Sequence, residues 1–159
     1  MWGGSLLVVV AMIVIKLGIK FYPVLPYYAN FVEFSMGQKS FGDYIARFDQ
    51  KMPRNYDVAR YIKTRTDEAD NIYIWGAQPD IYVMADRLPV GPLTVSFHVE
   101  DLKVYDKTMD WLKASPPKYI VMMADEPKEF KELKDWLESQ YILVTEIKEA
   151  KIWQYRAFL

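Results

Sequence analysis

Apolar positions are distributed unevenly along the chain, and their spacing separates an apolar amino-terminal segment from a regular pattern that follows it. Residues Leu6 to Ile15 form an unbroken apolar run, and Lys16 and Lys20 are the two charged residues among the first 22. A helix needs about 20 mostly apolar residues to cross a bilayer, and lysine side chains can extend to one interface. We therefore predict a transmembrane helix over residues 1–22.

Two other interpretations of this segment are weaker. A cleavable signal peptide normally has basic residues before its apolar run and small residues after it, and neither is found here. A buried helix of a soluble domain would carry polar positions at helical spacing, which the run from Leu6 to Ile15 does not have.

Residues 23–55 are predicted to be an interfacial connector. Aromatic residues are dense just after the apolar run, and prolines interrupt them at Pro23 and Pro26. Tyrosine and similar side chains gather where a helix leaves a bilayer, and proline ends a helix, so we expect the spanning helix to end at Pro23. A short amphipathic stretch, Asp43 to Phe48, follows in the same connector.

From residue 56 onward the pattern alternates between helical and strand periodicity. We predict that Asn55 caps one helix and Asp101 another, with a short helix over residues 78–86 and a last one starting near Pro127. The predicted strands cover residues 71–76, Thr94–Phe97, Lys118–Met123, Tyr141–Ile147 and Lys151–Phe158, the last two forming a hairpin that turns near Glu149 and Ala150.

This alternation predicts the fold class α/β. We expect a small, mainly parallel Rossmann-like sheet with flanking helices and an antiparallel final edge, preceded by one transmembrane helix. The α/β domain would span residues 56–159.

Charge and composition exclude several functions. Twenty basic and 21 acidic residues give a net charge of -1, which does not suggest nucleic-acid binding. The chain has no cysteine and a single histidine, His98, so a metal could bind through carboxylates alone, and we predict no metal site. The turn after Trp75 has one glycine and lacks the spacing of nucleotide-binding loops, so we predict no cofactor and no catalytic residue in this chain.

Five residues are candidates for binding a substrate. Ligands of open α/β sheets bind beyond the carboxyl ends of strands, which is where Trp75 and Gln78 lie, and Tyr82 follows on the next helix. Trp75 and Tyr82 could stack on a sugar, although we favour packing in the core.

The other two candidates are Arg87 and His98. Arg87 could bind a phosphate or a sugar acid, although we favour an arginine that ties its loop to a carboxylate such as Asp80 or Asp86. His98 could carry a proton, although a loop histidine near a helix cap is the interpretation that we favour.

The tract from residue 54 to residue 99 resembles the carboxy-terminal domain of bacterial glycosyltransferase family 39, the dolichyl-phosphate-mannose protein mannosyltransferase type, related to lipid A aminoarabinose transferases. The resemblance extends over roughly residues 37–147, including the strand PPKYIVMM. The matching positions are Trp75, Gly76, Pro79, Ile81, Tyr82, Arg87, Pro89, Phe97 and His98.

The resemblance implies a fragment of an inner-membrane enzyme that transfers a sugar from a polyprenyl-phosphate donor to a lipid, glycan or protein. The family's key acidic residue lies in a region that this chain lacks, so we expect the chain to be inactive alone. Its domain would lie outside the cytoplasm and cap the membrane site, with the lipid bilayer and the polyprenyl-phosphate-linked sugar as partners. Two alternatives stay open: a single-pass membrane-anchored module that binds glycan or protein, and a soluble α/β enzyme.

Overall fold

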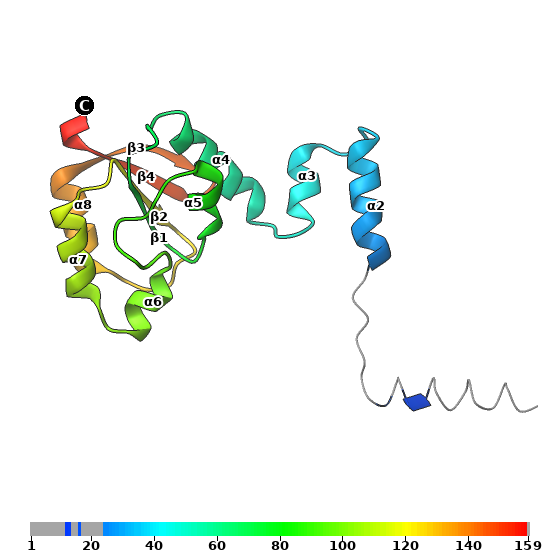
Figure 1. Cartoon of the computed structure of the whole chain (residues 1–159), viewed down its shortest axis with the longest axis horizontal. Coiled ribbons are helices and arrows are strands. Elements are labelled where there is room, and N and C mark those ends of the chain that lie inside the picture. Colours follow the sequence, from blue (N-terminus) through cyan, green and yellow to red (C-terminus); the bar gives the residue numbers. More distant parts are fainter. Residues whose placement is uncertain (1–11, 14–15, 17–23, 159) are drawn as a thin grey trace, which may run out of the picture. The chain divides into compact units, whose positions relative to one another are not determined.

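The computed structural model describes residues 12–13, 16 and 24–158 of the chain (Figure 1). It divides into two units, residues 1–47 and residues 48–159. The predicted transmembrane segment, residues 1–22, lies almost entirely outside the described residues. Among the helices that are described, none has the length and hydrophobicity needed to span a bilayer.

The first unit contains two described helices, α2 (Val24–Ser35) and α3 (Phe41–Ala46). Ser40 caps α3 by accepting a hydrogen bond from the backbone N–H of Asp43 at 3.1 Å. The two helices pack through Phe34, whose ring stacks on that of Tyr44 with 4.5 Å between centroids.

The second unit is an α/β domain. Its elements in chain order are α4 (Met52–Lys63), β1 (Ile72–Trp75), α5 (Asp80–Ala85), α6 (Ser96–Asp101), α7 (Tyr105–Ala114), β2 (Tyr119–Met123), α8 (Lys131–Gln140), β3 (Tyr141–Ile147), β4 (Ala150–Tyr155) and a final 3-10 turn, Arg156–Phe158.

The four strands form one sheet in the order β1-β2-β4-β3. β1 and β2 are parallel, whereas β4 pairs antiparallel with both β2 and β3. β3 and β4 form the predicted hairpin. Its two turn residues, Lys148 and Glu149, have φ values of 45° and 70°, as a tight turn between twisted strands requires.

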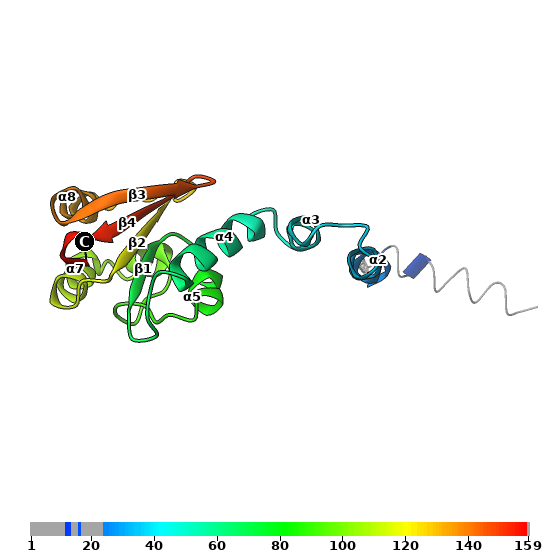
Figure 2. The same ribbon diagram turned by 90° about the horizontal axis from the view of Figure 1, so that it is seen from above.

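The sheet lies between two layers of helices (Figures 1 and 2). Alternate strand residues point to opposite faces, so Ile72 and Ile74 pack against α4 and α5, while Tyr73 and Trp75 pack on the side of α7 and α8. All four residues of β1 are buried, which is expected of a strand covered on both faces.

The α/β class is confirmed, but the expected mainly parallel sheet is wrong, because one strand pair of the three is parallel. The predicted strand Thr94–Phe97 does not exist in the described chain; these residues lead into helix α6. Val95 and Val99 are both buried and are four residues apart, so the spacing here is helical rather than alternating. Among the described residues, the parallel pairing of β1 outside β2 is therefore limited to an isolated bridge between Ile72 and Pro89.

Three helices also start at residues other than the predicted ones. α4 begins at Met52 with Pro53 in its first turn, so Asn55 lies inside the helix rather than at its cap. Asp101 is the last residue of α6, and α7 starts at Tyr105. α8 starts at Lys131, after an irregular segment that contains Pro127.

Candidate functional site

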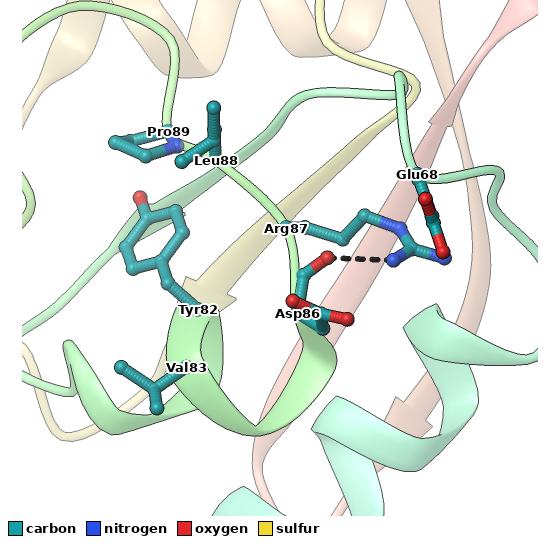
Figure 3. Close-up of a pocket in the computed structure, with 7 residues that line it drawn as sticks. All are labelled: Glu68, Tyr82, Val83, Asp86, Arg87, Leu88 and Pro89. Carbon is teal, nitrogen blue, oxygen red and sulfur yellow. Dashed lines mark hydrogen bonds between the residues drawn. The ribbon is translucent and has the colours of Figure 1, made fainter.

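A hollow of about 520 Å³ lies beside the carboxyl end of α5 (Figure 3). Its lining comes from α5, from the turn after it and from the loop that precedes β1. The lining residues are Glu68, Tyr82, Val83, Asp86, Arg87, Leu88 and Pro89. The hollow therefore contains two of the five candidates, Tyr82 and Arg87.

The turn that shapes the hollow is fixed by the backbone. Asp86 ends α5 in the left-handed conformation, with φ 58°, and turns the chain back toward the sheet. The chain then runs along the outer edge of β1, where the N–H of Ile72 donates to the carbonyl of Leu88 at 3.1 Å and the N–H of Val90 donates to the carbonyl of Ile72 at 3.2 Å. The loop is thereby held as a short extension of the sheet.

The guanidinium of Arg87 is occupied by hydrogen bonds inside the domain. Its Nε donates to Oγ1 of Thr66 at 2.8 Å, and Nη2 donates to the carbonyl of Thr66 at 2.7 Å. Nη1 donates to the backbone carbonyl of Asp86 at 2.6 Å, the contact drawn in Figure 3. Because the fork of donors is directed at these acceptors, Arg87 ties the turn to the end of α4 and has little capacity left for an external anion.

The hydroxyl of Tyr82 is also engaged within the fold. It accepts a hydrogen bond from the backbone N–H of Ile74 at 2.8 Å, and the side chain is buried. Burial raises the pKa of Tyr82 well above its ordinary value, so the hydroxyl stays protonated. Tyr82 serves as a wall of the hollow and as a link between α5 and β1.

Apolar side chains are exposed at the rim of the hollow. Val83 is 81% exposed and Leu88 is 72% exposed, although their chain neighbours Tyr82 and Arg87 are buried. The carboxylates at the rim are those of Glu68 and Asp86, and Asp86 lies 3.7 Å from Nζ of Lys63 in a solvent-exposed pair. The hollow is thus apolar at its rim and bordered by negative charge.

A second polar cluster lies at the carboxyl ends of β1 and β2. Arg54 is 8% exposed in its side chain and binds Asp125 through Nη1 to Oδ1 at 3.1 Å and Nη2 to Oδ2 at 3.4 Å. Lys51 binds the same carboxylate at 2.7 Å. Burial acts to raise the pKa of Asp125, but the hydrogen bonds and charges of Lys51 and Arg54 outweigh it and hold the pKa below its ordinary value.

This strand-end cluster includes Gln78. Its Nε2 approaches Asp125 Oδ2 at 3.5 Å, and its buried Oε1 has no hydrogen-bond partner in the described chain. Asn55, which lies inside α4, donates through Nδ2 to Oδ2 of Asp80 at 2.8 Å. These contacts join α4, the turn after β1 and the turn after β2, so the cluster fixes the positions of three elements.

The remaining candidates lie apart from the hollow. Trp75 is buried, donates through Nε1 to the carbonyl of Lys128 at 3.0 Å, and borders a separate groove of about 390 Å³ near α8. His98 is exposed on α6, where its ring contacts Phe97 with 4.5 Å between centroids. The structure brings together Tyr82 and Arg87 and separates Trp75, Gln78 and His98 from them.

Several residues of these sites were missed from the sequence. Val83 and Leu88 were not selected because a single exposed apolar residue has no distinctive pattern. Arg54 and Asp125 are 71 residues apart in the chain, yet Asp125 follows a buried strand closely, and that position is a usable signal for a polar group at the carboxyl edge of a sheet. Among the described residues, no group of three or more His, Cys, Asp or Glu could hold a metal ion.

The fold and its hollow define a small α/β domain whose buried polar groups are mostly bound to each other and whose rim is apolar. The model of the family described as "Putative competence-induced protein Ccs4 C-terminal domain" matches residues 53–156. Because this match covers more than half of the chain, the chain belongs to that family. No curated protein and no solved structure matches the chain significantly.

The family match corrects the resemblance to glycosyltransferase family 39, and with it the expected activity as a fragment of a sugar transferase. The motifs behind that resemblance have structural roles here. Gly76 leaves no room for a Cβ beside Met123, Pro79 precedes α5, and Tyr82 binds the backbone of β1. Such features serve any strand-turn-helix unit, so they do not identify a chemistry.

Proposed function

We propose that the chain acts in the competence response and that its α/β domain binds another protein through the hollow beside α5. The observation that carries the proposal is the exposure of Val83 and Leu88 at the rim of a hollow in which Tyr82 and Arg87 are already hydrogen-bonded within the fold. A surface of this kind gains free energy by covering apolar area, and it offers no activated group for a reaction.

The lining also indicates what the partner presents. An apolar side chain would fill the space between Val83 and Leu88, and a lysine or arginine beside it would meet Glu68 and Asp86. Asp86 is paired with Lys63 at 3.7 Å in an exposed geometry, which a partner's cation could replace at small cost. We therefore expect a partner segment that combines an apolar anchor with a basic neighbour.

Site-specific crosslinking tests this proposal. A photoreactive benzoylphenylalanine would replace Val83 in the full chain, expressed in a host after competence is induced. A crosslinked protein identified by mass spectrometry would then be purified and its affinity for the full chain measured. We expect the paired substitution Val83→Asp and Leu88→Asp to weaken that affinity by about tenfold or more, about 1.4 kcal/mol.

Leu102→Asp is the matched control, since Leu102 is an apolar residue of the same domain, 62% exposed and outside the hollow. It should leave the affinity unchanged. Equal affinity of the unsubstituted chain, the paired variant and the Leu102→Asp control would contradict the proposal that the partner binds at the hollow. The link to competence has its own test: the amount of the protein should rise when competence is induced, and a constant amount would argue against it.

A further inference from the structure

Helix α2 turns its polar residues toward its neighbour in the first unit. Asn30 is 2% exposed, and its Nδ2 donates to the backbone carbonyl of Tyr44 at 3.1 Å. Lys39 donates to Oδ1 of Asn30 at 3.1 Å and forms an ion pair with Glu33 at 2.5 Å. The side chains of Asn30 and Glu33 thus find their partners on the side that faces α3 and the turn between the helices.

The opposite side of α2 is an apolar stripe. It consists of Val24, Leu25, Tyr28, Phe31 and Val32, which are 48%, 81%, 60%, 53% and 49% exposed. At 3.6 residues per turn these positions fall within about 120° of the helix circumference. A helix on a water-soluble protein buries its apolar side and exposes its polar side. In α2 this arrangement is reversed.

The charge pattern indicates what covers the stripe. Glu33 is the first acidic residue of the chain, and the charged residues before it are Lys16 and Lys20. The sequence that leads into α2 is the apolar run from Leu6 to Ile15 followed by aromatic residues. An apolar and aromatic stripe that follows, in the sequence, a segment whose charged residues are lysines is complementary to the interface of a bilayer that contains anionic phospholipid.

We propose that α2 is an interfacial membrane helix whose apolar stripe lies among the headgroups and upper acyl chains of a phospholipid bilayer. Its inward polar residues and α3 would then lie on the water side. This inference is independent of the hollow beside α5, because α2 belongs to the other unit of the chain.

Spin labelling tests the proposal with the full chain, which has no native cysteine. Nitroxide labels would be placed singly by Leu25→Cys and Phe31→Cys on the stripe, and by Gln38→Cys and Asp106→Cys as controls at exposed positions outside it. Each labelled protein would be reconstituted with vesicles of phosphatidylethanolamine and phosphatidylglycerol. The accessibility of each label to oxygen, which partitions into lipid, is compared with that to a water-soluble nickel chelate.

We expect the stripe labels to favour oxygen and to lie about 5–10 Å into the interface, while the two controls favour the nickel chelate. A second reporter, Tyr28→Cys combined with Leu25→Glu and Phe31→Glu, should move into water, and circular dichroism would confirm that the helices are retained. Three results would overturn the proposal: no binding to vesicles, equal nickel accessibility at all positions, or spin–spin broadening at the stripe that reveals a second copy of the chain instead of lipid.

Discussion

Arg54 and Asp125 form a two-point ion pair that joins the start of α4 to the turn after β2, with nitrogen–oxygen distances of 3.1 and 3.4 Å. Removing one member of a buried pair leaves the other charge without compensation. We therefore expect Asp125→Asn to lower the free energy of unfolding by about 2–4 kcal/mol, measured by urea denaturation. Lys51→Met is the control, because the Lys51 side chain is 51% exposed and its removal should cost less than about 1 kcal/mol.

The same carboxylate predicts a dependence of stability on pH. Because the pKa of Asp125 in the folded domain is below its ordinary value of 3.8, its ionised form stabilises the fold. That contribution is complete above the ordinary pKa and is lost as the pH falls from there through the lowered pKa. Asp125→Asn should therefore flatten the acid limb of a plot of stability against pH. A variant with an unchanged acid limb would contradict this assignment.

Gly76 predicts a packing effect at the end of β1. A Cβ at this position would collide with Oε1 of Gln78 and lie 2.5 Å from Cγ of Met123, so Gly76→Ala should cost about 1–3 kcal/mol. Gly42→Ala is a matched control in α3, where the nearest atom to a new Cβ is Oγ of Ser40 at 3.7 Å. The control should leave the melting temperature of the α/β domain unchanged. Similar effects of the two substitutions would show that the space around Gly76 is larger than described.

Arg87 allows its structural role to be separated from a ligand-binding role. Arg87→Lys keeps the positive charge but removes the fork that binds Thr66 and the carbonyl of Asp86, so it should cost about 1–3 kcal/mol of stability. Thr66→Val removes one acceptor from the same network and should cost less. If Arg87→Lys left thermal stability unchanged and weakened partner binding, the guanidinium would be a contact residue instead of a support for the turn.

Tyr82→Phe should also destabilise the domain. The substitution removes the hydroxyl that accepts from the backbone N–H of Ile74, and it leaves that donor buried without a partner. We expect a loss of about 1–3 kcal/mol, with faster hydrogen exchange at the amide of Ile74. Slow exchange at Ile74 in the variant would indicate that another acceptor replaces the hydroxyl.

The sequence was sufficient to predict β1 and the β3–β4 hairpin, because burial on both faces and a short turn produce strong local patterns. It was insufficient for Thr94–Phe97, a short run of β-formers that continues into helix α6. Local patterns could not predict the strand order either, since the placement of β4 between β2 and β3 depends on contacts between distant segments.

The candidate site was predictable in a more limited way. Two of the five substrate-binding candidates, Tyr82 and Arg87, line the same hollow, and their hydroxyl and guanidinium are hydrogen-bonded within the fold. Short motifs such as Trp-Gly and Pro-x-Ile-Tyr favour a tight turn between a strand and a helix. Unrelated proteins contain the same kind of turn, so these motifs do not identify a family. The exposure of Val83 and Leu88 becomes visible when the turn at Asp86 is known in three dimensions.

The position of β4 between β2 and β3 has a consequence for how the protein is made. β4 is the last strand of the domain in the chain, yet it pairs with two others, so β2 and β3 cannot be joined into one sheet until residue 155 has left the ribosome. Until β4 is synthesised, the edge of β2 that will pair with it has no partner strand in the sheet, so this edge is exposed during synthesis. Closure of the sheet is therefore a late step in the folding of this domain.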